Sequence, residues 1–174
     1  TDTYSGGLIG NFIKDDATLT VENCLVTGTI EGRRNTDGAH LVGGFVGYIS
    51  GAKSKADTEA SIVITNSLNA GRVTGMNKAI RVGSIFGQIS EYRMYELNAV
   101  YATSESYRQQ GTVPFAGAYG SKKIDEVQFY AADLLKGIGG YQYTTLDFEE
   151  CWAAIANKTP ELKQFSTETA LSVA

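Results

Sequence analysis

The sequence predicts a mainly β protein: a parallel β-solenoid of about three repeats, followed by a C-terminal α/β cap. A glycine-rich core recurs three times, and the stretches around it alternate apolar and polar residues as half-buried strands do. The 174 residues contain 20 glycines and only 2 prolines, which suits stacked strands joined by tight glycine corners. We expect residues 1–110 to form the repeats and residues 111–174 the cap of the same globular unit.

The repeated core has the form G-[GS]-apolar-apolar-G-x-apolar. Its copies occupy residues 6–12 (GGLIGNF), 43–49 (GGFVGYI) and 83–89 (GSIFGQI). The second invariant glycine of each copy stands inside an apolar run, where glycine is expected only at a bend, a bulge or a close approach of two backbone segments. These three positions are Gly10, Gly47 and Gly87.

A second block follows the first two cores. Residues 19–25 (LTVENCL) match residues 62–68 (IVITNSL), and a Gly-x-apolar-x-Gly segment then recurs downstream in both copies. In the third copy the block decays to residues 95–102 (YELNAVYA), which keep the asparagine but lose the downstream glycines.

Stacking is what makes this pattern stable. A single copy cannot bury its apolar face, whereas equivalent strands stacked on one another bury a continuous core of Leu, Ile, Val and Phe. Asn23 and Asn66 lie between two strand-like stretches and suit corners, because asparagine tolerates the left-handed backbone. We expect these two side chains to stack as an asparagine ladder.

The last third of the chain has a different pattern. After Gly111 the glycine core disappears, and residues 124–130 alternate like a strand. Asp147 and Glu150 have capping-box-like spacing and predict the start of a helix. Apolar residues at helical spacing give this helix one apolar face, made of Phe148, Cys151, Trp152 and Ile155. Because an open solenoid end exposes unpaired strand edges, we expect this segment to cap it.

The core and the block behind it resemble the GLUG-type repeat of bacterial secreted and cell-surface proteins, named for a Gly-Leu-apolar-Gly core. Residues 7–10 (GLIG) and 44–47 (GFVG) carry the resemblance, each preceded by glycine and followed by an Asn-centred strand pair. The resemblance extends over residues 5–102, and Ser84 departs from the pattern. Members of this family look like β-solenoid stalks or adhesin modules, some attached to immunoglobulin-A-specific metallopeptidases. The resemblance therefore implies a secreted or cell-surface location.

Charge and hydropathy exclude several classes of partner. The net charge is −4, and the 15 Lys and Arg residues are spread along the chain, so no basic stripe is available for nucleic acid or an anionic membrane surface. No apolar run is long enough to span a bilayer, so we expect no membrane insertion. The N-terminus lacks a signal-peptide pattern, and because the repeat begins abruptly we expect further coils before Thr1 in the natural protein.

Candidate catalytic groups are few. His40 is the sole histidine, nothing beside it resembles a nucleophile elbow, and no second histidine completes an HExxH zinc site, so we expect a solvated loop residue. Asp15–Asp16 and Glu149–Glu150 are the only adjacent carboxylate pairs, but neighbours in a strand face opposite ways, and the second pair suits the first turn of a helix. We predict no catalytic, cofactor or metal site.

The two cysteines carry no motif. Cys24 and Cys151 are far apart in the sequence and lack CxxC spacing, so we expect small buried hydrophobes. Whether the fold brings them close enough to pair is left open, because sequence distance says nothing about the distance between Cβ atoms.

The tyrosines offer a possible binding surface. Exposed tyrosine rings stack on sugars or anchor a protein partner, but strand tyrosines more often pack with only the hydroxyl exposed, and we favour the second interpretation. The residues concerned, in the less regular part of the chain, are Tyr92, Tyr95, Tyr101, Tyr107, Tyr119 and Tyr130.

Together these observations predict a non-catalytic, extracellular bacterial surface module, a stalk or an adhesin that binds a host glycan or an extracellular protein. The alternative is an accessory module that positions substrate for a secreted hydrolase or peptidase. A carbohydrate-active enzyme in its own right is the third reading, and it requires clustered outward acids. An exposed first coil also predicts end-to-end self-association of this chain.

Overall fold

The computed structural model describes residues 2–13, 17–33, 40–51, 60–76, 81–91, 93–103, 106, 116–119, 122–130 and 145–170. Within these residues the chain forms seventeen β-strands and no helix. Most strand pairs are parallel. The protein is thus mainly β with parallel sheets, as the sequence predicts.

The strands follow one another in three similar passes of the chain and a C-terminal part. The first pass contains β1 (Thr3–Gly6), β2 (Ile9–Phe12), β3 (Leu19–Glu22), β4 (Leu25–Val26) and β5 (Thr29–Arg33). The second contains β6 (His40–Gly43), β7 (Val46–Ile49), β8 (Ala60–Asn69) and β9 (Arg72–Met76). The third contains β10 (Arg81–Gly83), β11 (Phe86–Ile89) and β12 (Met94–Thr103). The remaining strands are β13 (Gly117–Tyr119), β14 (Lys122–Ile124), β15 (Gln128–Tyr130), β16 (Trp152–Ala153) and β17 (Glu161–Leu162).

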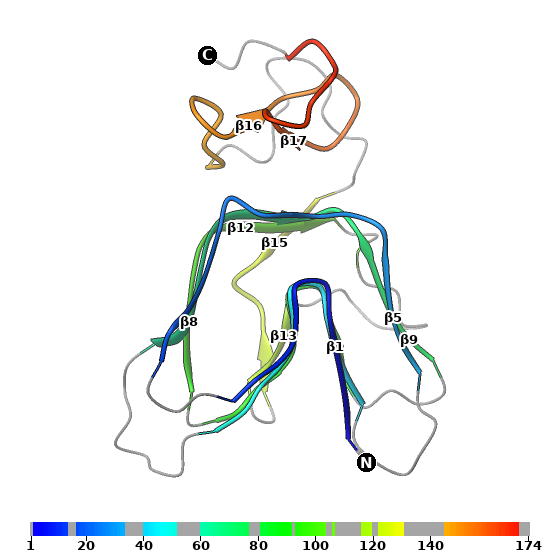
Figure 1. The fold of residues 1–174 in the computed structure, drawn as a ribbon, viewed down its shortest axis with the longest axis vertical. Coiled ribbons are helices and arrows are strands. Elements are labelled where there is room, and N and C mark those ends of the chain that lie inside the picture. Colours follow the sequence, from blue (N-terminus) through cyan, green and yellow to red (C-terminus); the bar gives the residue numbers. More distant parts are fainter. Residues whose placement is uncertain are drawn as a thin grey trace.

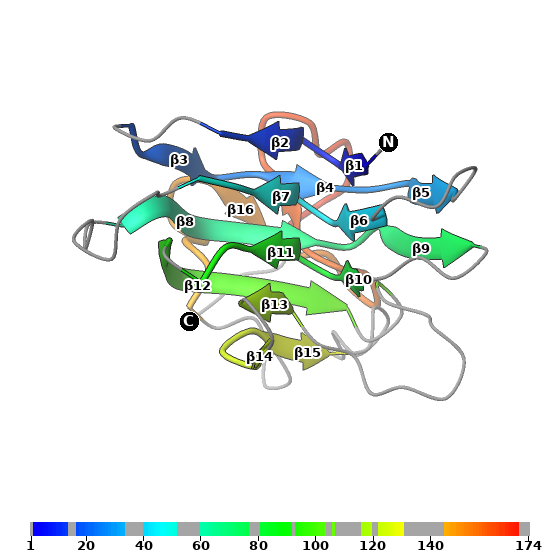
Figure 2. The same ribbon diagram turned by 90° about the horizontal axis from the view of Figure 1, so that it is seen from below.

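Strands at equivalent places in successive passes pair with one another. The larger sheets have the orders β1-β6-β10, β14-β13-β11-β7-β2 and β15-β12-β8-β3, with β4 also on β8, and β5 pairs with β9. The register aligns Gly6 with Gly43 and Gly43 with Gly83. Figure 2 shows the passes as successive layers, from β1 to β5 at one side to β14 and β15 at the other. Residues that the sequence aligns therefore lie side by side.

Seen along the stacking direction, each layer has a narrow ridge inside a wider frame (Figure 1). One leg of the ridge is the sheet of β1, β6 and β10, and the other contains β2, β7 and β11. The frame consists of β3, β4, β8 and β12 on one side and across the top, and of β5 and β9 on the other side.

The two legs of the ridge touch through their backbones. A Cβ atom built on Gly47 lies 2.5 Å from the Gly10 carbonyl oxygen and 2.6 Å from that of Ser5, closer than real Cβ atoms approach. A Cβ on Gly6 meets the Gly47 amide nitrogen at 2.7 Å. Of the three reasons that the sequence left open for these glycines, the close backbone approach is therefore the one confirmed.

The tip of the ridge is hydrogen-bonded from layer to layer. The Leu8 amide donates to the Phe45 carbonyl at 3.0 Å, and the Phe45 amide donates to the Ile85 carbonyl at 2.9 Å. The Ile85 amide continues the series by donating to the Ala116 carbonyl at 2.9 Å. The turn between the two legs is thus part of the stack and is as regular as the strands.

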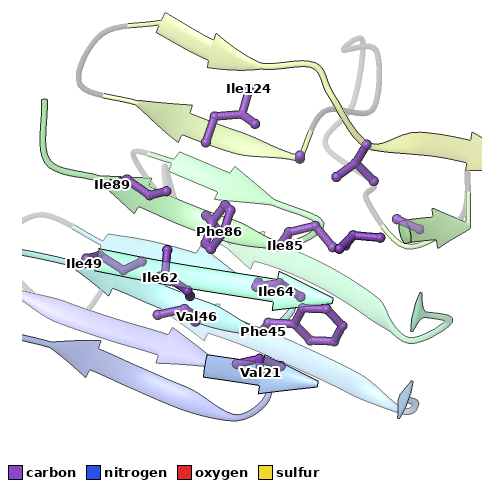
Figure 3. Packing of buried hydrophobic residues seen from close by; sticks show 14 of the residues in the cluster. Val21, Phe45, Val46, Ile49, Ile62, Ile64, Ile85, Phe86, Ile89 and Ile124 are labelled. Atoms are coloured by element: carbon purple, nitrogen blue, oxygen red, sulfur yellow. The ribbon is translucent and has the colours of Figure 1, made fainter. Parts of the chain in front are cut away.

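The hydrophobic core fills the space between the ridge and the frame. Phe45, Val46 and Phe86 enter it from the ridge, and Ile62 and Ile64 face them from β8; all five are fully buried (Figure 3). Full burial of each such side chain contributes about 1.5–3 kcal/mol. Stacking therefore supplies a core that one layer alone does not have.

A buried asparagine joins the frame to the ridge tip. Asn69, at the end of β8, is fully buried and donates through Nδ2 to the Ser84 carbonyl at 2.6 Å. Its Oδ1 accepts from the Gly71 amide at 2.9 Å. Gly44 passes directly beside this amide group, so no side chain fits there. Both polar ends of Asn69 are satisfied, which makes its burial tolerable.

The predicted asparagine ladder is confirmed. Asn23 and Asn66 have positive φ angles of 54° and 48°, and Asn66 Nδ2 donates to Asn23 Oδ1 at 2.5 Å. In the third layer the sequence alignment is wrong by one residue. Asn98 pairs with Thr65, so Ala99 occupies the corner, with φ 52°. An alanine there carries strain that asparagine and glycine avoid.

A fourth, partial layer follows the third. β13 pairs in parallel with β11, with Tyr119 beside Ile89, and β15 pairs in parallel with β12. β14 then pairs antiparallel with β13 and ends that sheet. The single strand predicted for residues 124–130 is two strands instead, because the chain turns between the buried side chains of Ile124 and Val127. Stacking thus extends beyond the last recognisable glycine core.

The predicted C-terminal helix is absent from the described residues, so the prediction of an α/β cap is wrong. Asp147 Oδ1 accepts from the Glu150 amide at 2.9 Å, and the Asp147 carbonyl accepts from the amides of Cys151 and Trp152, but the chain makes only this one turn. It then enters β16, which pairs antiparallel with β17. All four residues from Trp152 to Ile155 are buried, which the single apolar face of a surface helix does not allow.

The segment of residues 145–170 lies on the outer face of the frame (Figure 1). An apolar ladder of Leu25, Leu68 and Tyr101 points outward there, in register across three layers. Trp152 packs on it and donates through Nε1 to the Asn66 carbonyl at 3.2 Å. The Asp147 amide donates to Asn66 Oδ1 at 2.8 Å. This segment thus covers the side of the stack and does not close its end.

We expect Gly47→Ala to lower the free energy of unfolding by about 3 kcal/mol or more, because the new methyl group meets backbone atoms that cannot move aside. Gly28→Ala is the matched control. Gly28 has φ 84° but open space around it, so only conformational strain of about 1–2 kcal/mol is expected. Urea unfolding of both variants measures the difference, and equal losses would contradict backbone contact as the reason for Gly47.

We expect Ala99→Gly to raise the free energy of unfolding by up to about 1 kcal/mol, because it relieves the left-handed strain at this corner. Ala102→Gly, in the same strand but with ordinary strand backbone, serves as the control and should lower stability by about 1 kcal/mol. Thermal and urea unfolding report both changes. Destabilisation by both variants would rule out strain at Ala99.

Candidate functional site

A ladder of polar and aromatic side chains lies on one leg of the ridge, toward the ends of β2, β7 and β11 that are farther from the tip. We call this part of the ridge its foot. Asn11, Tyr48 and Gln88 pair in register on β2, β7 and β11, and we call them the foot ladder. Asn11 is exposed, and the other two are half-buried. All three lie outside the hydrophobic core clusters. Neighbouring strands are about 4.8 Å apart, so the ladder presents one such side chain per layer.

A second tyrosine joins the foot ladder from the other leg of the ridge. The rings of Tyr4 and Tyr48 lie 5.1 Å apart between centroids and are inclined by 30°. The Tyr4 hydroxyl donates to Asp2 Oδ2 at 3.1 Å. Partial burial and this contact with Asp2 raise the pKa of Tyr4, so its hydroxyl stays protonated at physiological pH. Ser50 Oγ donates to Asn11 Oδ1 at 3.4 Å.

These groups suit a neutral ligand with many hydroxyl groups. Amide side chains offer donors and acceptors at once, and tyrosine rings offer an apolar surface with a polar edge. The foot ladder carries no charge of its own, and Asp2 adds one carboxylate beside it. The arrangement has the components of recognition and contains no nucleophile beside a general base.

The sequence does contain a signal for this site, although it does not by itself identify the site. The three residues of the foot ladder occupy the variable x position of the repeated glycine core. The tyrosines singled out by the sequence lie in the irregular region, whereas Tyr4 and Tyr48 lie within the most regular one. Only the register of β2, β7 and β11 shows that the x positions form one continuous row.

The tyrosines that the sequence pointed to are packed wherever their side chains are described. The Tyr95 ring lies 6.1 Å from that of Phe86, and its hydroxyl donates to Glu126 Oε1 at 2.7 Å. Tyr101 is only 3% exposed, and its hydroxyl is hydrogen-bonded to Thr145 Oγ1. For these two, the packed interpretation is confirmed. The side chains of Tyr92, Tyr107, Tyr119 and Tyr130 lie outside the described part of the structure.

His40 is not the solvated loop residue that we expected. It begins β6, pairs with Thr3 and is 2% exposed. Its Nε2 atom lies next to Gly32 and has no hydrogen-bond partner among the described residues. Burial lowers the pKa of His40, so the ring is neutral at physiological pH. This position removes His40 from contact with a substrate in solution.

Two small cavities are lined by described residues. One of about 100 Å³ lies between β12, β15 and Thr145, beside Glu126 and Gln128. Another, of about 200 Å³, lies between the Asn23 corner and the C-terminal segment, beside Cys151 and Lys163. Both are smaller than the roughly 300–1,000 Å³ of typical small-molecule pockets.

The remaining titratable candidates are dispersed. Cys24 and Cys151 are free and half-buried, and burial raises the pKa of both thiols. Glu149 and Glu150 are exposed, and Asp15–Asp16 lies outside the described residues. Within the described ranges, no group of three or more His, Cys, Asp or Glu residues is placed to hold a metal ion.

Comparison with known proteins found no matching family model, no matching curated protein and no matching solved structure. Across the ranges that the structure covers, no helix has the length and apolar character needed to cross a membrane.

We expect the stability of the protein to fall as the pH drops below about 6.5, the usual pKa of an unfolded histidine. The folded-state pKa of His40 is lower, so above this pH both states are neutral and stability is full, whereas below it the unfolded state takes up the proton first. One such proton changes the free energy of unfolding by at most about 1.4 kcal/mol per pH unit. Urea unfolding between pH 7.5 and 5.0 measures this slope.

His40→Leu is the control, because other groups also titrate in this range. The free energy of unfolding of this variant should decline less steeply with falling pH than that of the wild type. Parallel profiles for the two proteins would show that His40 does not contribute.

Proposed function

We propose that this chain is a β-solenoid module of a secreted or cell-surface protein, and that it binds a host glycan without catalysing a reaction. The parallel pairing of equivalent strands through successive layers supports the solenoid. The resemblance of residues 5–102 to GLUG-type repeats supports the location.

The observation that carries the glycan proposal is the Tyr4–Tyr48 pair beside the amides of the foot ladder. Sugars present flat C–H faces and hydroxyl edges, which match an aromatic ring next to side chains that both donate and accept. Because the foot ladder repeats at the strand spacing, about 4.8 Å, contacts can follow an extended chain of sugar rings across several layers.

The positions of the titratable groups favour binding over catalysis. General acid–base chemistry needs a positioned group that reaches the substrate. His40 is buried and neutral, and the exposed Glu149 and Glu150 belong to a turn on the outer face of the frame, away from the ridge. The foot ladder itself offers hydrogen bonds and ring surface, which are what a binding site needs.

A glycan array probed with the 174-residue chain tests the proposal, with extracellular-matrix proteins printed beside the glycans. We expect a specific glycan signal, and a loss of at least tenfold in affinity in Tyr48→Ala, which removes the ring. Tyr48→Phe keeps the ring and should retain most of the binding. Asn98→Ala, an exposed amide on β12, is the matched control and should bind like the wild type.

Thermal unfolding of each variant shows whether the fold is intact. A silent glycan array contradicts the proposal, as does an equal loss in Tyr48→Ala and Asn98→Ala. A signal on the matrix proteins alone would identify a protein-binding module in place of a glycan-binding one.

A further inference from the structure

A second polar row runs beside the foot ladder. Ser50 and Ser90 each lie two residues after a member of the ladder, and both are half-buried. They occupy equivalent places in successive layers, because each donates from its backbone amide, at 2.9 Å, to the carbonyl at the end of the strand one layer before it, β2 for Ser50 and β7 for Ser90. Ser50 Oγ also donates to Asn11 Oδ1 at 3.4 Å. The serine row and the foot ladder therefore belong to one surface.

Together the two rows form a polar lattice with one unit per layer. A complete unit is a ladder residue and the serine two positions further along the chain, as in Tyr48 with Ser50 and Gln88 with Ser90. In the first layer Ile13 stands in place of the serine. The two members of a unit are about 6.6 Å apart along an extended strand, and neighbouring layers are about 4.8 Å apart. One unit thus offers two hydrogen-bonding groups across the width of one sugar ring.

The lattice is straight along the stack. The pairings of β2 with β7 and of β7 with β11 keep one register along their paired residues, and Figure 2 shows the three strands in successive layers. The next residue in register after Gln88 is Ala118 on β13, which is buried. Among the described residues the polar row therefore ends at Gln88 on this side. A ligand that contacts every unit must follow a straight line and repeat its groups at the strand spacing.

Linkage geometry decides which sugar chains meet this requirement. In β-1,4-linked chains of glucose-type sugars, both bonds that join a ring to its neighbours are equatorial. Such a chain is a straight ribbon, and its rings follow one another at an interval close to the strand spacing of about 4.8 Å. In α-1,4-linked chains one of the two bonds is axial, so the chain turns at every ring and leaves a straight row. The lattice contains no charged side chain, and the Asp2 carboxylate beside Tyr4 disfavours an anionic chain.

We propose that the foot of the ridge is a row of sugar subsites for an unbranched, uncharged, β-linked glycan chain that runs along the stack, and that Ser50 and Ser90 help to select this chain. The inference rests on the glycan-binding function proposed above and names the class of ligand. The Tyr4–Tyr48 pair offers ring surface to the face of one sugar, and the unit of Gln88 and Ser90 binds a further sugar by hydrogen bonds. Affinity therefore rises with the number of rings that the chain places on the row.

Calorimetric titration of the 174-residue chain with soluble oligosaccharides of two to six sugars tests the ligand class. Cello- and chito-oligosaccharides are β-1,4-linked and uncharged. Malto-oligosaccharides differ from the cello series only in their α linkage, and hyaluronan oligosaccharides carry a carboxylate on every second sugar. We expect at least one of the two β-1,4-linked series to gain about tenfold in affinity between two and four sugars, the effect of one or two added hydrogen bonds. The malto and hyaluronan series should bind at least tenfold more weakly at equal length.

A double variant tests the third-layer unit. Gln88→Ala with Ser90→Ala removes its amide and its hydroxyl and should flatten the rise of affinity with chain length. Thr20→Ala with Asn98→Ala is the matched control, because it removes an exposed hydroxyl and an exposed amide from the frame. The control should keep the wild-type profile. Thermal unfolding of both double variants shows whether the fold is intact.

Several outcomes overturn the proposal. They are an affinity that does not change with chain length, equal binding of the malto and cello series, tighter binding of the hyaluronan series, and equal profiles in the two double variants. Absence of binding to both β-1,4-linked series, or array signals from branched structures or single sugars alone, overturns this proposal and leaves the glycan-binding function standing when the array is positive. A silent array contradicts both.

Discussion

The close backbone contact between the two legs of the ridge is the constraint on which the rest of this structure depends. Gly6, Gly10 and Gly47 let the legs approach until no side chain fits between them. The ridge is therefore narrow enough to enter the frame and fill its interior with Phe45 and Val46. A wider ridge would leave the frame without an apolar partner, and the layers would have no shared core.

The same constraint places the proposed site. The x position stands between the invariant glycine, which faces the other leg, and an apolar residue that enters the core, as Tyr48 does between Gly47 and Ile49. Its side chain is therefore left at the foot of the ridge. Parallel register then aligns Asn11, Tyr48 and Gln88 into one row, and the nearness of the two legs brings Tyr4 to Tyr48. Packing and the proposed recognition thus use different residues of a single short motif.

The corner asparagines connect this stack to the C-terminal segment. Asn66 bonds to Asn23 in the layer before it, while its Oδ1 and its carbonyl accept from Asp147 and Trp152. In the third layer Ala99 ends the ladder. The segment that binds at this corner covers an outward apolar row, so it stabilises the side of the stack.

The sequence by itself determined the β class, the alignment of the glycine cores and the Asn23–Asn66 ladder, because period-two alternation and left-handed corners are local properties. It did not predict β13, the division of residues 124–130 between β14 and β15, the one-residue shift at Ala99 or the absence of a helix after Asp147. Each of those depends on contacts with distant strands, such as the burial of Trp152 against the Asn66 corner. The burial of His40 and the row at the foot of the ridge were likewise decided only by tertiary structure, since local pattern specifies which faces alternate but not which backbone lies opposite.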